Sequence, residues 1–277
     1  MPKNVEILRG SYFLKNVFIL FYLIYSFTNC QDPTVGCTDL RATNFDVTVV
    51  KTNNTLCTYP NLRLKTNYVV GDSSLSFNTT YQNDLGQPFR IINNQMYLSD
   101  YQLVTADGTV FKTIDSLSLF RQMDTIKTLN SFALIGRNNG FDFPIGQFQG
   151  VGKTFSKLRF KLGLTNEVNL TSPAKMPTNH PLSTHADSTY ITSEKTYIFN
   201  KLIIAKGVNF KDTLKLNITT FKDIELTKNI VTTAGFDAVI PLKINYLRLF
   251  DGINFGATEN IIKEKIVNNS SNIFSIQ

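Results

Sequence analysis

The 277-residue chain has no tryptophan, only two histidines and only three cysteines. Imidazole is the commonest transition-metal ligand and the usual side chain for proton transfer near neutral pH. Any metal or acid–base chemistry that uses histidine is therefore confined to His180 and His185, which share one polar, turn-rich stretch. Because this stretch lies between two predicted strands, it is the first candidate site.

The signatures of common enzymes are also absent. The sequence contains no Gly-x-Ser-x-Gly, no phosphate-binding P-loop, no dinucleotide-binding glycine pattern and no His-Glu-x-x-His. A Ser-His-Asp triad could be assembled from either histidine, but a triad is recognised by geometry and no spacing favours one. We therefore expect no enzymatic activity, with a hydrolase as the alternative.

Positive charge is in excess but is not concentrated anywhere. Lysine and arginine together number 28 against 21 acidic residues, for a net charge of +7. The lysines form no dense run and no basic helix, whereas nucleic-acid binding requires a stripe of positive charge. We assign the charge to solvated faces of strands and expect no nucleic-acid partner.

The N-terminus has the pattern of a secretory signal. A polar, basic lead precedes an apolar run at residues 17–27, which is too short for a transmembrane helix. Residues 1–29 are predicted to be a signal peptide of the lipoprotein type, because Cys30 follows directly and Thr28 suits a lipobox, although Phe27 and Asn29 do not. The alternative is an ordinary cleaved signal, with Cys30 unmodified or removed.

This N-terminus also predicts where the protein resides. The chain is expected to be exported to a bacterial cell envelope, as an outer-membrane lipoprotein or in the periplasm. The predicted partner is a membrane, to which a lipid on Cys30 would anchor the protein.

Residues 30–65 are predicted to form a linker to that lipid anchor and a small disulfide-closed module. An exported chain meets an oxidising environment, so Cys37 and Cys57 are expected to pair. Closing a loop of about 20 residues stabilises by about 3 kcal/mol in the chain-entropy model. Segments 36–46 (GCTDLRATNFD) and 53–59 (NNTLCTY) resemble a short cysteine-bounded repeat of exported proteins from Bacteroidetes-type bacteria.

Calcium is the cation to consider in this module. The repeat carries an acidic pair shortly before its closing cysteine, but this chain has Asn53 and Asn54 there. Asp39 and Asp46 could still bind a hard cation through oxygen. We favour the other interpretation, in which both carboxylates form turns through local hydrogen bonds.

Residues 66–277 are predicted to form one all-β domain, an antiparallel β-sandwich. Apolar and polar residues alternate at 75–81, 158–164, 214–218 and 242–246, which is typical of half-buried antiparallel strands. Turn signals such as Asp107-Gly108 separate the strands. Helical pattern is confined to 115–123 and 259–267.

The two histidines are five positions apart. At this spacing they would not lie on the same side of a helix or of a strand. A shared site would therefore require a folded loop. Its donors would be His180 and His185 with an oxygen ligand such as Asp187 or Tyr190, a set that suits copper or zinc. In the alternative, His180 precedes Pro181 in an extended turn and only hydrogen-bonds to backbone, while His185 is exposed.

Several segments resemble, in order and spacing, the MbnP-type family of copper-binding exported bacterial proteins. They are 75–81 (LSFNTTY), 86–89 (GQPF), 95–100 (QMYLSD), 158–163 (LRFKLG) leading to Asn169, 179–182 (NHPL), 196–199 (TYIF), 249–252 (LFDG) and 269–275 (NSSNIFS). The resemblance covers about residues 66–277, and it implies a β-sandwich. It also implies copper binding by histidine, and His180 matches the family's histidine position.

One feature of that family is missing here. In its characterised members a partner dihaem protein oxidises a tryptophan to kynurenine, which then binds copper. Residues 189–193 of this chain (TYITS) stand where the family has its tryptophans, so a kynurenine ligand is impossible. A dihaem peroxidase-like partner, which the resemblance implies, would find its substrate only if Tyr190 or Tyr197 substitutes.

The predicted function is accordingly an exported, non-catalytic β-sandwich protein that binds copper through a histidine-containing loop. The alternative is a cell-surface interaction or adhesion module that holds no metal.

Overall fold

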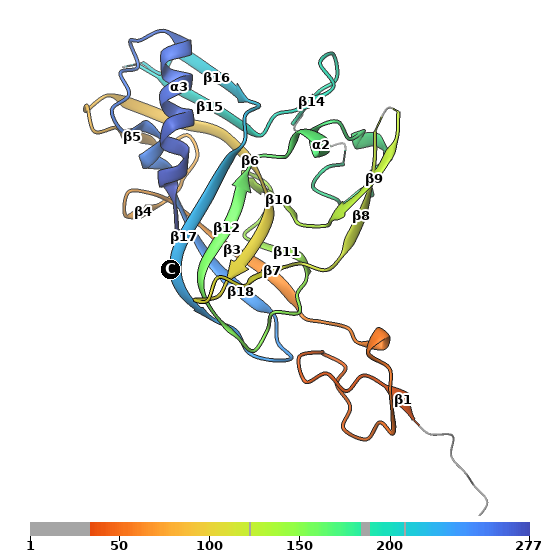
Figure 1. The fold of residues 1–277 in the computed structure, drawn as a ribbon. Helices are drawn as coiled ribbons and strands as arrows, with labels where there is room; N and C mark the ends of the chain where they lie inside the picture. Colours follow the sequence, from red (N-terminus) through yellow and green to blue (C-terminus); the bar gives the residue numbers. More distant parts are fainter. Residues whose placement is uncertain (1–33, 122, 184–188, 208) are drawn as a thin grey trace, which may run out of the picture. The chain divides into compact units, whose positions relative to one another are not determined.

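The computed structural model describes residues 34–121, 123–183, 189–207 and 209–277 (Figure 1). The predicted signal peptide and Cys30 lie outside these residues, as do His185 and Asp187. Within the described ranges no helix is long and apolar enough to cross a membrane. The chain divides into two compact units: a smaller one that includes 34–38 and 45–57, and a larger one of 39–44 and 58–277.

The smaller unit is closed by a disulfide between Cys37 and Cys57, whose Cα atoms are 4.9 Å apart. It contains two short parallel strands, β1 (Val35–Gly36) and β2 (Lys51–Thr52), and the 3₁₀ turn η1 (Asn54–Leu56). Among its described residues only Cys37 is buried. The disulfide was predicted from the sequence and is confirmed, and it takes the place of a hydrophobic core.

The two aspartates considered for calcium are each engaged by local partners. In the smaller unit, Asp46 Oδ1 accepts hydrogen bonds from the Thr48 backbone N–H (2.8 Å) and hydroxyl (2.7 Å). In the larger unit, Asp39 pairs with the Arg41 guanidinium at 2.6 Å, and the Tyr59 hydroxyl donates to it at 3.0 Å. The hydrogen bonds from Arg41 hold the pKa of Asp39 well below its usual range. Asp46 therefore stabilises a local turn, whereas Asp39 forms an ion pair with Arg41.

An eight-stranded antiparallel sheet forms one layer of the larger unit. Its continuous path runs β16 (Asp212–Ile218), β15 (Asn200–Lys206), β6 (Pro88–Val104), β12 (Thr154–Leu162) and β17 (Lys222–Val231). The 17-residue β6 also pairs with β5 (Thr80–Gln82), β7 (Val110–Lys112) and β10 (Phe132–Gly136). The predicted strands at 158–164 and 214–218 are β12 and β16. Their alternation persists as alternating burial.

A five-stranded sheet forms the second layer. Its order is β11 (Asp142–Gln147), β3 (Asn61–Val70), β18 (Ala238–Asn245) and β19 (Phe274–Ile276), with β4 (Ser73–Ser74) on β3. The central pair, β3 with β18, is parallel and departs from the expected antiparallel order. Parallel neighbours need a long crossover connection, which here runs through the other sheet. Because β3 begins at Asn61, the sandwich starts before the expected boundary at residue 66.

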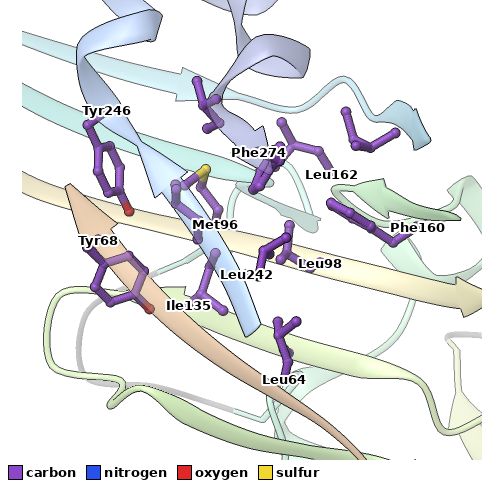
Figure 2. Close-up of a cluster of buried hydrophobic side chains, with 14 of the residues drawn as sticks. Leu64, Tyr68, Met96, Leu98, Ile135, Phe160, Leu162, Leu242, Tyr246 and Phe274 are labelled. Atoms are coloured by element: carbon purple, nitrogen blue, oxygen red, sulfur yellow. The ribbon is translucent and has the colours of Figure 1, made fainter. Parts of the chain in front are cut away.

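One continuous hydrophobic interior, the sandwich core, fills the space between the sheets. Figure 2 shows Leu64 and Tyr68 of β3 and Leu242 of β18 in one cluster with Met96 and Leu98 of β6. Each fully buried aliphatic side chain of this kind contributes about 1.5–3 kcal/mol. The two layers therefore hold together through apolar burial, which confirms the predicted β-sandwich.

The C-terminal part covers one end of the sandwich core. It consists of η3 (Tyr246–Phe250), α3 (Glu259–Asn269) and η4 (Ser270–Ile273). Figure 1 shows α3 beside β16. The helix predicted at 259–267 is thus confirmed. Its buried residues Ile262 and Ile266 are four apart, as one face of a helix requires.

The helical turns predicted at 115–123 are wrong. That segment is β8 (Ser116–Phe120), which pairs with β9 (Thr125–Leu129) in a hairpin closed by Arg121 and Asp124. Leu117 and Leu119 alternate with serine, and the hairpin buries Leu119 completely. Leu117 and Leu119 lie on the same face of the strand, and packing of that face stabilises the strand over a helix.

The strand predicted at 75–81 is interrupted. β4 (Ser73–Ser74) ends before it, and β5 (Thr80–Gln82) includes only its last two residues. Asn78 adopts a left-handed backbone conformation (φ 63°), and the Ser76 backbone N–H donates to the Tyr81 hydroxyl at 2.8 Å. A left-handed residue reverses the chain direction, so the alternation here describes a turn.

Candidate functional site

A second, smaller hydrophobic cluster packs on the face of β6 and β10 opposite to the sandwich core, since Tyr97 alternates with the core residues Met96 and Leu98, and we name it the loop cluster. It is built around the β8–β9 hairpin, α2 (Asn166–Asn169), η2 (Pro173–Lys175), β13 (Tyr190–Ile191) and β14 (Thr196–Tyr197). Its buried residues are Tyr97, Leu119, Phe132, Leu134, Leu164, Val168, Met176, Leu182, Tyr197 and Phe199. Figure 1 shows the hairpin and α2 on the side of the larger unit away from α3.

Three sequence segments that carry the family resemblance meet in this cluster. The Tyr97 N–H donates to the Phe199 carbonyl (2.9 Å), and the Gly163 N–H donates to the Tyr97 carbonyl (2.7 Å). The Ser99 hydroxyl closes the junction by donating to the Gly163 carbonyl at 2.7 Å. Gly163 has φ +110°, and a Cβ there would lie 2.8 Å from the Phe199 ring, so glycine is required.

Two buried tyrosines from these segments hold the His-Pro-Leu segment. The Tyr197 hydroxyl donates to the Leu182 carbonyl at 2.7 Å, and the Tyr97 hydroxyl donates to the Pro181 carbonyl at 3.1 Å. Because the hydrogen of Tyr97 goes to a carbonyl, the Thr189 hydroxyl at 2.8 Å is the donor to Tyr97. Burial raises the pKa of both tyrosines well above the usual range. Both phenols therefore remain neutral donors near neutral pH.

The strand that carries Tyr197 is itself held from α2. Asn169 Oδ1 accepts from the Tyr197 N–H at 2.7 Å, and its amide donates to the Thr196 hydroxyl at 2.7 Å. Tyr190 on the partner strand packs against Tyr197, with ring centroids 4.9 Å apart and planes at 70°. Asn169 thus holds the backbone of Tyr197, and Tyr190 packs against its ring.

His180 lies in the turn that these tyrosines hold, and its half-buried ring is engaged at both nitrogens. The Leu182 N–H donates to Nδ1 at 3.1 Å, and Nε2 lies 3.0 Å from Asn130 Oδ1. The Phe132 ring meets the imidazole edge to face, with centroids 5.9 Å apart. The Ser183 N–H completes the turn by donating to the His180 carbonyl at 2.9 Å.

The sequence-predicted site residues are only partly described. His180 and Tyr190 lie in the loop cluster, His180 in the turn and Tyr190 in β13, whereas His185 and Asp187 lie outside the described residues. Burial raises the pKa of Tyr190, which disfavours its phenolate as a ligand. Across the described ranges, no group of three or more histidine, cysteine or carboxylate side chains is arranged to hold a metal ion.

Several residues of this site were not predicted from the sequence. Tyr97 and Tyr197 stand in the quoted segments QMYLSD and TYIF, so the resemblance marked their positions without giving their role. Asn130 and Phe132 reach His180 from the junction of β9 and β10, fifty residues away. An asparagine at the end of a strand is an ordinary turn residue, so no sequence signal distinguishes Asn130.

The fold places the chain among the all-β sandwich proteins, and its candidate site is a histidine turn held by two buried tyrosines. A family model described as MbnP matches residues 59–269, and the chain belongs to this family. The resemblance noted in the sequence is therefore confirmed. The solved structure of MbnP from Methylosinus trichosporium aligns with a TM-score of 0.41 and 11% identity, over 68% of this chain and 76% of that chain. Among curated proteins, no significant match to the sequence is found.

Proposed function

We propose that this protein is an exported, non-catalytic β-sandwich that binds copper at the turn containing His180. The supporting observation is that the family-matching segments converge on this turn, where Tyr97 and Tyr197 hold the carbonyls of Pro181 and Leu182. Such directional support of a loop is typical of a site whose geometry matters. His185 and Asp187 are the further ligands in this proposal, with Tyr190 as a weaker oxygen donor.

One described side chain, the imidazole of His180, is of a type that suits copper, and a bound ion would have to displace one of the two partners of its ring nitrogens. The imidazole of His180 is half-buried and oriented by its neighbours, and imidazole nitrogen suits copper. Copper bound there would be a one-electron redox ion carried by the protein. The chain's own residues would hold the imidazole, shield it on the Phe132 side and fix its backbone.

Export and the remaining partners belong to the same proposal. The signal-like N-terminus supports delivery to the cell envelope with a lipid on Cys30. A dihaem peroxidase-like partner would meet tyrosine instead of tryptophan. Tyr197 is fully buried and Tyr190 is half-buried, so Tyr190 is the phenol that such a partner would reach.

Copper titration of the mature, full-length protein tests the proposal. We expect the wild type to bind one copper ion, with nitrogen hyperfine structure in the electron paramagnetic resonance spectrum. His180→Ala and His185→Ala should each weaken binding, whereas Asn217→Ala on the exposed face of β16 should leave it unchanged. Wild-type affinity in both histidine variants, or no binding by the wild type, would exclude the metal site.

The second candidate function is a surface interaction module without metal. It is supported by the smaller unit, which exposes apolar side chains: Val47 is 82% and Val50 is 77% exposed. Exposed apolar residues in a unit with no core favour contact with another surface. Loss of a binding partner on Val47→Ser with Val50→Ser, in a protein that takes up no copper, would favour this function.

A further inference from the structure

Exposed apolar side chains gather at one end of the larger unit. Three of the five most exposed large apolar side chains in the described part of this unit are Leu40 (68%), Val231 (70%) and Phe236 (68%). Val231 and Phe236 line one shallow surface hollow together with Val239. We name Leu40, Val231, Phe236 and Val239 the end patch. Apolar residues scattered singly are ordinary on a protein surface, whereas a contiguous group marks a contact surface.

The end patch combines two segments that are far apart in the sequence. Leu40 belongs to residues 39–44, and the other three side chains belong to residues 231–239, which include the turn from β17 to β18. The two segments touch, because a Cβ on Gly235 would lie 3.9 Å from the Ala42 carbonyl oxygen.

The turn that carries Phe236 is fixed at both ends by hydrogen bonds. The Thr232 N–H and hydroxyl each donate to the Lys153 carbonyl at 2.9 Å, and the Lys153 N–H donates to the Thr232 hydroxyl at 3.1 Å. At the other end, Asp237 Oδ1 accepts from the Asn61 N–H at 2.8 Å. The apolar side chains are therefore displayed on ordered structure, and their exposure does not come from a fraying strand.

The charges beside the end patch suit lipid headgroups. The two nearby carboxylates are each paired with arginine: Asp237 lies 3.7 Å from Arg63, and Asp39 lies 2.6 Å from Arg41. Lys153, at the base of the turn, adds a positive charge. Paired carboxylates repel the phosphates of a bilayer little, and a lysine near the surface is attracted to them.

A lipid on Cys30 would keep the end patch close to a membrane. Asp39, the first residue of the larger unit, is nine positions after Cys30. Because an extended chain spans about 3.3–3.6 Å per residue, nine residues reach roughly 30 Å at most. Residues 39–44 thus begin within that distance of the lipid. Such a tether makes the contact intramolecular in effect, so that even a weak apolar contact is populated.

We infer that the end patch is a membrane-docking surface, which places Phe236 and its apolar neighbours at the boundary between lipid headgroups and acyl chains. This inference rests on the lipid on Cys30, which belongs to the proposed function. It goes beyond that function because it assigns a bilayer contact to folded residues. Apolar side chains with positive charge beside them are typical of surfaces that lie in this boundary.

The first test uses the absence of tryptophan, since one substitution then supplies a unique fluorescent reporter. The mature, lipid-anchored protein is reconstituted into vesicles of phosphatidylethanolamine and phosphatidylglycerol. We expect Phe236→Trp to emit at short wavelength and to be quenched by brominated acyl chains, at a depth of about 5–10 Å.

Phe221→Trp is the matched control for this reporter. Phe221 is also exposed (40%), and it directly precedes β17, whose other end is Val231. The control should emit as a water-exposed tryptophan and should not be quenched. Equal quenching at the two positions would mean that the end patch has no preferred contact with the bilayer, which overturns the inference.

The second test needs no reporter in the protein. Lipids with a photoreactive group at the headgroup–acyl boundary should label residues 231–239 of the wild type and spare Phe221, as mapped by mass spectrometry. Val231→Ser with Phe236→Ser should lose most of this labelling. If Phe236→Trp does not fold, as judged by circular dichroism, the labelling of the wild type decides the matter.

The outcomes separate this inference from the proposed function. If the N-terminal peptide carries the mass of a lipid but residues 231–239 are neither labelled nor quenched, the docking surface is overturned and the anchor stands. A Cys30 without lipid overturns both. Short-wavelength emission at Phe236→Trp without quenching by brominated lipid would mean that protein covers the patch, which also overturns the inference. Copper titration is independent of all three results.

Discussion

The sandwich core and the loop cluster are stabilised in different ways. The sandwich core is filled mostly by aliphatic and aromatic side chains that alternate along strands, and side-chain volume is what most of its positions require. In the loop cluster, hydroxyls of Tyr97 and Tyr197 bind particular carbonyls. Side-chain volume therefore determines the stability of the sandwich core, whereas the direction of hydrogen bonds determines the geometry of the turn in the loop cluster.

This difference predicts where function can change without loss of the fold. A sandwich that depends on volume tolerates exchange among apolar residues, but a turn held by single hydrogen bonds moves when one oxygen is removed. The four predictions below test the contrast.

The largest effect is expected in the sandwich core. Leu242 is fully buried, so Leu242→Ala should lower the free energy of unfolding by about 2–5 kcal/mol, measured by urea denaturation. Lys243→Ala, at the next position of β18, is the control and should change it little. If the change at Leu242 is as small as that at Lys243, volume does not govern this region.

The smaller unit depends least on apolar burial, because a disulfide takes the place of a hydrophobic core. Replacing Cys37 and Cys57 together by serine should remove about 3 kcal/mol from this unit in the chain-entropy model. Limited proteolysis followed by mass spectrometry should then show faster cleavage within 45–57. Equal cleavage rates in the two proteins would show that other contacts order the unit.

A smaller effect is expected in the loop cluster. Tyr197→Phe leaves the buried Leu182 carbonyl without its donor, which costs about 1–3 kcal/mol. Hydrogen exchange at the Leu182 and Ser183 amides should accelerate. Tyr81→Phe, which removes a more exposed hydroxyl contact with Ser76, is the control and should leave those amides unaffected. Unchanged exchange in Tyr197→Phe would mean that the hydroxyl does not hold the turn.

The smallest effect appears only at alkaline pH. Burial raises the pKa of Tyr97 and Tyr197 above the value of a free phenol, about 10. Above that pH the unfolded chain releases protons that the folded protein retains, so this contribution to stability is complete below about pH 10 and falls as pH rises. Each Tyr→Phe variant should flatten the fall by up to about 1.4 kcal/mol per pH unit.

Unfolding titrations from pH 9 to 12, with phenolate absorbance as a second signal, check this slope. Parallel curves for wild type and variants would mean that these phenols ionise in the folded protein. Near neutral pH these phenols should add no pH dependence to the free energy of unfolding.

Features that depend on neighbouring residues could be predicted from the sequence, whereas features that depend on distant partners could not. Strands such as β12 and β16 were predictable because alternation is a local property that survives in the fold. The hairpin at β8–β9 was mistaken for helical turns, since the burial of Leu119 depends on partners far along the chain. The parallel pairing of β3 with β18 was missed for a similar reason, because register between distant strands leaves no periodic signal.

The amino-acid sequence by itself placed the candidate site at His180 and His185, through the scarcity of histidine and the family segments around His180. The disulfide followed from the two remaining cysteines of a chain predicted to be exported, and the class of fold followed from period-two alternation. Only the tertiary structure brought Asn130, Tyr97 and Tyr197 to the histidine turn. A hydrogen bond depends on the positions of two atoms to within tenths of an ångström. These three side chains lie 15 to 84 positions from their partners in the turn, and they acquire such positions only after the strands that carry them have packed.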